Sequence, residues 1–379
     1  MVCQSEAAEW SLWPSIGVKG VYNDNLILTP QPHDATYGYW VSPAAEFAGK
    51  TERLEVSSRI ATDFVSYYGG QQNNFTNIHL PLTVRYKTEK DLLGFTGGFN
   101  RDNTLISELL DTGLVLRFTQ RNQWTANPSW TRRITEKLSA QSSFQFSDTT
   151  YENGLRLGLV DYQLFGGSGG LLYQLTEQDQ IQLTGSYTNF HTVNAPSPIR
   201  ASFPAVSLSL THAFTETLTG TAFGGASFVS STTQTASDNI KAQSTVWLFG
   251  ATLAKKFERT SVQVQVDRKI VPSGLGLLIQ TDRAGVTVSH DLSETLTASF
   301  DGSAYKVSGI TELAIGGRLP ESRFFSATPA IAWKFSEWWK MELSYTYRHR
   351  EVDGFSDPAM SNATMFMLTY YPPKLAFSN

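Results

Sequence analysis

The sequence predicts an all-β protein: a closed antiparallel transmembrane β-barrel of about 18 strands, with short periplasmic turns and longer outer loops. Three observations predict this fold. Apolar and polar residues alternate with a period of two, because successive side chains of a strand point to opposite faces. A turn containing glutamate recurs about every 40 residues. No stretch reaches the roughly 18 consecutive apolar residues of a membrane-spanning helix.

The recurring turns give the strand count. Their glutamates are spaced by 37, 47, 41, 39, 42, 36 and 43 residues, and all but one follow a serine or threonine. A repeat of this length has to be considered before any other architecture. Eight turns join sixteen strands in pairs, and the first and last strands bring the number to eighteen, with both ends on the turn side. The turn glutamates are Glu52, Glu89, Glu136, Glu177, Glu216, Glu258, Glu294 and Glu337.

The strands follow in order from this frame. Residues 10–22 open the barrel and residues 23–37 form a loop. Strands run toward the turns over roughly 38–49, 75–87, 118–134, 161–175, 202–214, 243–257, 279–292 and 323–335. They run away from the turns over roughly 53–67, 92–102, 138–151, 180–191, 218–230, 260–270, 295–307 and 339–350, and 362–372 closes the set. Residues 10–373 are thus predicted as one barrel, after an N-terminal segment (1–9, a signal remnant or disordered) and before a C-terminal tail (374–379).

Strand length and the two faces support a membrane location. A strand of about 13 residues at about 3.3 Å each, tilted near 40°, spans roughly 33 Å. Val206, Leu208 and Leu210 share one predicted outward face, whereas polar residues occupy the opposite faces. Aromatic residues gather beside the turns, as in an interfacial girdle. For Trp338 and Trp339 a sugar-stacking role is the alternative to the girdle, which their position favours.

Charged residues on the polar faces are predicted to line a water-filled channel. Charges of both signs on opposing walls can filter solutes, or they can simply satisfy one another, and the sequence leaves both interpretations open. The predicted channel-lining residues are Arg59, Asp63, Arg85, Arg133, Asp267, Lys269, Arg283, Lys334, Glu342, Arg348 and Arg350.

Some residues break the alternation. Arg101, His212, Arg268 and His290 have the parity of the outward stripes, and we interpret them as strand ends or bulges. Proline recurs inside strands that run toward the turns. Because proline cannot donate to a strand ladder, this recurrence predicts a shared local bulge. The prolines are Pro43, Pro81, Pro128, Pro204 and Pro329.

Composition excludes several functions. The net charge of −4 and the scattered basic residues indicate no nucleic-acid partner. Cys3, the single cysteine, permits no intrachain disulfide and no thiolate metal site. It is interpreted as the remnant of a signal region in preference to a lipidated cysteine, because no apolar segment precedes it.

No catalytic or cofactor site stands out. The six histidines lack metal-ligand spacing, and no metal or cofactor is predicted. The glycine-rich run at 166–170 is interpreted as a place where the wall bends rather than as a phosphate cradle, since no helix follows. His349 near Asp353, and His191, are the only candidates for a barrel enzyme. We therefore predict that the protein is not an enzyme.

Three stretches resemble a known family. They are Val21–Pro30, Val41–Pro43 and Leu368–Pro373, and together with the repeated turns they are similar to the β-barrel porins associated with exopolysaccharide and exosortase loci. The resemblance implies an integral protein of the Gram-negative outer membrane that exports a polysaccharide with periplasmic export proteins. The chain departs from the usual terminal aromatic of such barrels, because Lys374 to Asn379 follow the last predicted strand.

Four functions remain in order of preference. The first is a polysaccharide-export channel, and the second is a general or solute-selective diffusion porin for small hydrophilic solutes. A barrel enzyme and a surface structural or receptor barrel follow. A solute porin should narrow its lumen with an inward loop, whereas an exporter should stay broad. The predicted outer loops have about 7–16 residues, and no substantial plug is expected from them.

Overall fold

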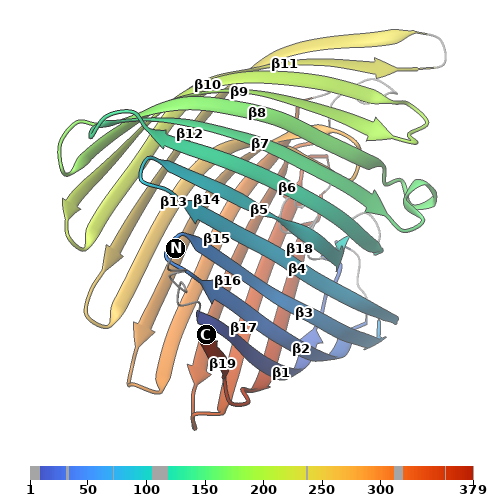
Figure 1. The fold of residues 1–379 in the computed structure, drawn as a ribbon. Helices are drawn as coiled ribbons and strands as arrows, with labels where there is room; N and C mark the ends of the chain where they lie inside the picture. The colour runs from blue at the N-terminus through green and yellow to red at the C-terminus, as the bar shows by residue number, and fades with distance from the viewer. Residues whose placement is uncertain are drawn as a thin grey trace.

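One antiparallel sheet closes on itself to form the whole molecule (Figure 1). The computed structural model describes residues 9–30, 34–70, 72–104, 118–235, 238–310, 319–354 and 356–378. Eight pairs from Ile16–Tyr370 to Asn23–Ala363 join the first wall strand to the last. The predicted closed barrel of eighteen antiparallel strands is therefore confirmed.

The observed bounds differ from the predicted ones by a few residues. The wall strands are β1 (Glu9–Asn23), β2 (Thr36–Lys50), β3 (Leu54–Gly69), β4 (Asn73–Lys87), β5 (Asp91–Asn103), β6 (Gln120–Arg133), β7 (Leu138–Tyr151), β8 (Asp161–Gln174), β9 (Asp179–Val193), β10 (Ile199–Thr215), β11 (Leu218–Gln234), β12 (Asn239–Lys256), β13 (Thr260–Pro272), β14 (Leu278–Asp291), β15 (Leu296–Gly309), β16 (Ser322–Trp333), β17 (Trp339–Val352) and β18 (Ala359–Tyr370). A short 3₁₀ helix, η1 (Gly154–Leu157), lies between β7 and β8.

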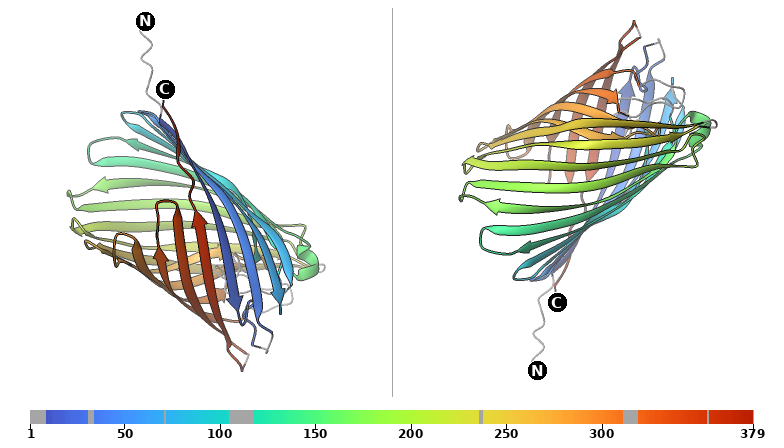
Figure 2. Two further views of the ribbon diagram at one scale, coloured as in Figure 1. Left: turned by 90° about the horizontal axis from the view of Figure 1, so that it is seen from below. Right: turned by 90° about the horizontal axis from the view of Figure 1, so that it is seen from above.

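The predicted C-terminal tail contains one more strand. β19 (Leu375–Ser378) pairs antiparallel with Glu9–Leu12 at the start of β1. Pro372 and Pro373 separate it from β18, so the two segments lie one after the other along the same edge of β1 (Figure 2). Lys374 lies between them, with its Nζ 4.5 Å from the ring centroid of Trp13.

Hydroxyl groups, rather than the glutamates, hold the recurring turns. In six turns the serine or threonine oxygen accepts a hydrogen bond of 2.9–3.1 Å from the backbone N–H three residues later. Such a bond stabilises a turn by satisfying a backbone donor that the ladder leaves free. The acceptors are Thr51, Thr88, Thr135, Thr176, Ser293 and Ser336.

The predicted proline bulge is wrong. Beside Pro43, pairing stops after Val41–Phe64 and resumes at Ala44–Ala61, so the register is unchanged. The same interruption occurs beside the other four prolines. Proline lacks the N–H that would make the missing bond but remains compatible with an extended strand, so pairing is lost locally without an inserted residue. The one register shift in these ladders lies between Ala213 and Thr215.

The two faces of the wall differ as a membrane barrel requires. Large apolar side chains are exposed on the outside, with Trp247 at 67% and Val206 at 57% of their surface. Near the turns the rings of Trp339 and Tyr370 lie 4.9 Å apart, within the predicted aromatic girdle. An apolar outer band around a lumen with polar walls is the arrangement of outer-membrane barrels, and the protein is an integral outer-membrane protein. In the described ranges, no helix is long and apolar enough to cross a membrane.

Candidate functional site

The cross-strand register places ten of the eleven predicted channel-lining residues on the inner face. Residues paired across neighbouring strands point to the same side of a sheet. One row joins Arg283 to Tyr305, Tyr305 to Phe324 and Phe324 to Arg350, across β14 to β17. The other predicted residues in the strands share that face by the same counting, and Lys334 directly follows β16. Whether these side chains contact a passing solute stays a prediction.

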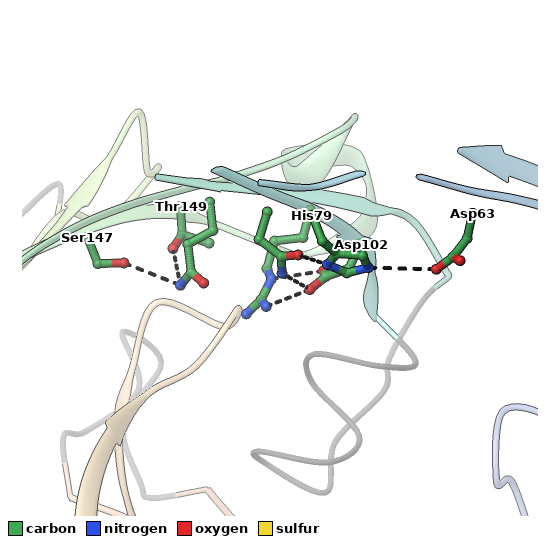
Figure 3. A network of polar contacts seen from close by, with 8 residues as sticks. Asp63, His79, Asp102, Ser147 and Thr149 are labelled. Carbon is green, nitrogen blue, oxygen red and sulfur yellow. Dashed lines mark hydrogen bonds and ion pairs between the residues drawn. The ribbon is translucent and has the colours of Figure 1, made fainter. Parts of the chain in front are cut away.

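A chain of polar contacts runs along the inner face of β3 to β6 (Figure 3). His79 lies between Asp63, whose carboxylate oxygen is 3.7 Å from Nε2, and Asn100, which contacts Nδ1. Asn100 donates to Asp102 at 2.5 Å. The guanidinium of Arg121 donates twice to the same carboxylate, at 3.1 and 2.9 Å.

Sequence reasoning missed the centre of this network. Asp102 and Arg121 are both buried and form a bidentate pair, which fixes orientation as well as neutralising charge. Gln123 extends the polar face toward β7 by donating to Ser147 and Thr149 at 3.2 and 3.3 Å. Arg121 lies within the predicted strand 118–134 and has the same parity as the predicted Arg133, so the alternation rule could have found it.

The loop after β1 folds into the lumen and is pinned there. The Nδ2 of Asn25 donates to the carbonyl oxygens of Thr29 and Met360, at 2.9 and 2.7 Å, and its Oδ1 accepts from the N–H of Thr29 at 3.0 Å. Leu28 adopts a left-handed φ of 52°. Leu26 and Leu28 are buried as a result, in a cluster with Val65 and Tyr67 of β3 and with inner residues of β14 to β16, namely Ile279, Tyr305, Val307 and Phe324.

A second group of loops meets on the opposite part of the lumen. Leu277 and Leu278, at the end of the β13–β14 connection, pack against Tyr162 and Phe190 of β8 and β9. The N–H of Val160 donates to Gly274 across this junction, at 2.8 Å. Glycine is required at position 276, where φ is +74° and a Cβ atom would lie 2.9 Å from the Thr192 methyl group.

Inward packing of these loops was not predicted from the sequence. Each connection is short, but several together fill part of the long-loop end with apolar side chains. Leu319 of the β15–β16 connection packs against both clusters and links them. The apolar clusters are favourable because they remove side chains from water that would otherwise fill the lumen.

A cavity of about 480 Å³ lies under the first cluster. Lys19, Trp40 and Tyr67 line it from β1 to β3, and Glu342 and Arg348 line it from β17. The Lys19 ammonium lies 3.9 Å from the centre of the Trp40 ring, a favourable cation–π distance. The walls thus combine aromatic surface with both signs of charge, at the size of a small-solute site.

Two arginines in this region lack hydrogen-bond partners, whereas two nearby carboxylates have them. The Nε atoms of Arg348 and Arg350 are buried and make no hydrogen bond with the described residues. By contrast, Glu342 pairs with Lys340 at 3.2 Å. Asp301 of β15, which also lines the cavity, accepts a hydrogen bond of 2.9 Å from Thr287. A permeating anion would therefore meet positive charge at Arg348, which lines the cavity and has no acidic partner among the described residues.

The residues that break the alternation are paired outside the lumen. Arg268 forms a bidentate pair with Asp282, and Arg101 bonds Glu152 at 2.5 Å. His212 lies 2.7 Å from Asp179. The register is continuous at Arg101 and Arg268, so the bulge interpretation is wrong for them. Ion pairing, and not a change of face, makes outward charges acceptable there.

Four of the five described histidines contact carboxylate, amide or threonine groups, and the enzyme candidate His191 lies against the Phe165 ring. The enzyme candidate His349 lies 3.2 Å from Glu351 rather than beside Asp353, and His290 lies 2.7 Å from the Thr260 hydroxyl. No described histidine contacts a serine hydroxyl at hydrogen-bond distance. The lack of enzymatic activity stays a prediction.

Comparisons with known proteins return solved outer-membrane barrels. A scan of family models gave no match, and neither did a search of curated proteins. OccK5 (OpdH) of Pseudomonas aeruginosa is 14% identical, with 96% of this chain and 98% of that chain covered and a TM-score of 0.44. OccAB2 of Acinetobacter baumannii is 9% identical, with 97% and 98% covered and a TM-score of 0.47.

A larger transporter also matches in part. The ferric citrate transporter FecA in its unliganded form is 10% identical, with 90% of this chain but 60% of that chain covered and a TM-score of 0.49. Similarity at this level leaves the function to be inferred from this chain's own residues.

Proposed function

We propose that this protein is an outer-membrane diffusion channel for small hydrophilic solutes, with a preference for anions. The observation that carries the proposal is the inward packing of the loops around Leu28 and Leu277, which narrows the long-loop end of the lumen. A hydrated polymer needs a wide tube, whereas a small solute fits a cavity of about 480 Å³. Of the two leading sequence-based hypotheses, this favours the porin.

The anion preference follows from the distribution of unpaired charge. Arg348 and Arg350 keep donors free, while Glu342 and Asp301 already have partners. Unsatisfied cationic donors inside a pore attract anions and repel cations. Aromatic walls at Trp40 and Tyr67 would restrict the size of the solute as well as its charge.

Release of the β1–β2 loop tests the proposal. Asn25→Ala removes all three side-chain hydrogen bonds that hold Leu26 and Leu28 inside the barrel, so we expect a larger single-channel conductance in planar bilayers. Asn239→Ala, at an exposed strand end, is the matched control and should conduct like the wild type. Equal conductance in all three proteins would contradict the assignment of this loop as the constriction.

Polysaccharide export with periplasmic partners stays an untested hypothesis. Its experiment is deletion of the gene in the native host, followed by assay of extracellular polysaccharide. Lost export together with a wide, non-selective conductance would favour the exporter. Unchanged export together with anion-selective conductance would favour the porin.

A further inference from the structure

The lipid-facing wall over β7 to β11 contains two adjoining recesses. The one nearer the long loops has a volume of about 500 Å³ and is bordered by Phe165, Tyr187, His191 and Arg200. The one nearer the turns has a volume of about 580 Å³, with Tyr187 and Phe228 among its walls. Tyr187 borders both recesses, which follow one another along the strands. We call the two recesses together the outer groove.

The floor of the outer groove is bare although the fold does not require it to be. Gly167, Gly169 and Gly185 form the floor with their outward faces. A Cβ atom at Gly185 would meet nothing within 4 Å. At the inward-facing Gly166, by contrast, it would lie 2.5 Å from the Tyr187 carbonyl oxygen. Steric demands of the wall explain Gly166 but leave Gly185 unexplained.

Unpaired positive charge lies at the long-loop end of the groove. Arg200 is opposite His191 on β9 and Thr232 on β11, and Thr232 is opposite Lys241 on β12. In the described chain, no carboxylate lies within ion-pair distance of Arg200 or Lys241, and neither has a further partner. Arg101, Arg268 and Arg323, the other outward arginines near the long loops, each pair with an acid.

We propose that the outer groove binds a membrane lipid that carries a phosphate headgroup. Arg200 and Lys241 bind the phosphate, and His191 adds a donor beside them. The acyl chain lies over the glycine floor between Tyr187 and Phe228. Val206 at the lower recess is six residue steps along β10 from Arg200, roughly 20 Å at about 3.3 Å per residue, which is the reach of a lipid chain. Lipid surrounds this wall, so an apolar groove with a cationic end is complementary to it in shape and in charge.

Lipid titration of the purified, delipidated full-length protein by native mass spectrometry tests the proposal. The probes are dimyristoyl phosphatidic acid, dimyristoylglycerol and inorganic phosphate. We expect retention of phosphatidic acid and no comparable retention of phosphate alone. Arg200→Gln combined with Lys241→Gln should weaken phosphatidic acid binding about tenfold, because charge-assisted hydrogen bonds are lost, and should leave dimyristoylglycerol unaffected. Gly185→Leu should weaken the binding of both lipids.

Two controls separate the groove from the rest of the wall. Gly20→Leu fills an equally open site on β1, and Arg323→Ala removes a rim arginine that already has an acidic partner; both should bind like the wild type. Heat-modifiable migration in the same samples reports folding, and Arg200→Lys should retain most binding if the double variant fails to fold. Wild-type binding by Gly185→Leu, or equal retention of inorganic phosphate, would overturn the proposal.

Discussion

At the scale of single residues, Arg348 and Arg350 differ from the inner Arg121, because no acid among the described residues neutralises them. A unit charge about 5 Å from a permeating ion in a water-like lumen contributes roughly 0.8 kcal/mol, a change of about fourfold in ion partition. Arg348→Gln should therefore lower the anion-to-cation permeability ratio by about that factor, as measured by reversal potentials in a KCl gradient. Arg133→Gln is the control, since its guanidinium donates to the backbone carbonyl oxygen of Glu89 beside a turn and does not line the cavity. An unchanged ratio for Arg348→Gln would count against anion selection by this residue.

The pair of Asp102 and Arg121 has a structural role that can be measured separately. Arg121→Leu leaves a buried carboxylate without its bidentate partner, which should cost about 3–5 kcal/mol of the free energy of unfolding. Denaturant titration in lipid vesicles gives the value. The double variant Asp102→Leu with Arg121→Leu should recover much of the loss, because no unpaired charge remains. A double variant as unstable as the single one would show that packing, and not charge, dominates at this position.

Alternation could predict which side chains face inward but not what they contact. The period of two assigned Arg283, Arg348 and Arg350 to the lumen face without any coordinates. The inward packing of the loops could not be predicted, because loop residues do not alternate between apolar and polar as strand residues do. The one available signal was the apolar run of Leu26, Ile27 and Leu28 inside a loop that otherwise appears polar. Pairing of Arg268 with Asp282 was equally hidden, since it depends on the register between two strands.

At the scale of elements, the recurring turn shows which of its two marker residues matters. Ser336 accepts hydrogen bonds from the N–H groups of Trp338 and Trp339, at 3.2 and 3.1 Å. The adjacent Glu337 is exposed. Ser336→Ala should lower the free energy of unfolding by about 1 kcal/mol, by analogy with the loss of a helix N-cap, and Glu337→Gln should leave it unchanged. Denaturant titration of both variants measures these losses. A larger loss for Glu337→Gln than for Ser336→Ala would show that the glutamate stabilises the turn.

Strands were predictable as elements because their length and turn spacing repeat eight times, whereas local irregularities were not. Proline removes one donor, and two outcomes were compatible with that: a bulge, or a short gap in the pairing without a bulge. Beside both Pro43 and Pro81 the pairing is interrupted without a bulge. In a closed barrel every inserted residue shifts the register of the neighbouring ladder. A local interruption of pairing beside proline leaves the register of the whole wall unchanged.

At the scale of the whole molecule, closure depends on the seam between the two ends of the chain. β1 has to satisfy its free edge against β18 and, for Glu9–Leu12, against β19. Deletion of residues 375–379 exposes the backbone groups of that first segment, as in any unpaired edge strand, but keeps the eight pairs between β1 and β18. We expect the truncated protein to insert and conduct. Its transition from the folded to the unfolded gel band on heating should come several degrees lower than in the full chain.

Substitution of Lys374 by Ala alone, which removes the contact with Trp13 but leaves β19 in place, should change the transition much less. If truncation leaves the transition temperature where it was, the seam is held by β18 alone, and β19 contributes nothing to closure.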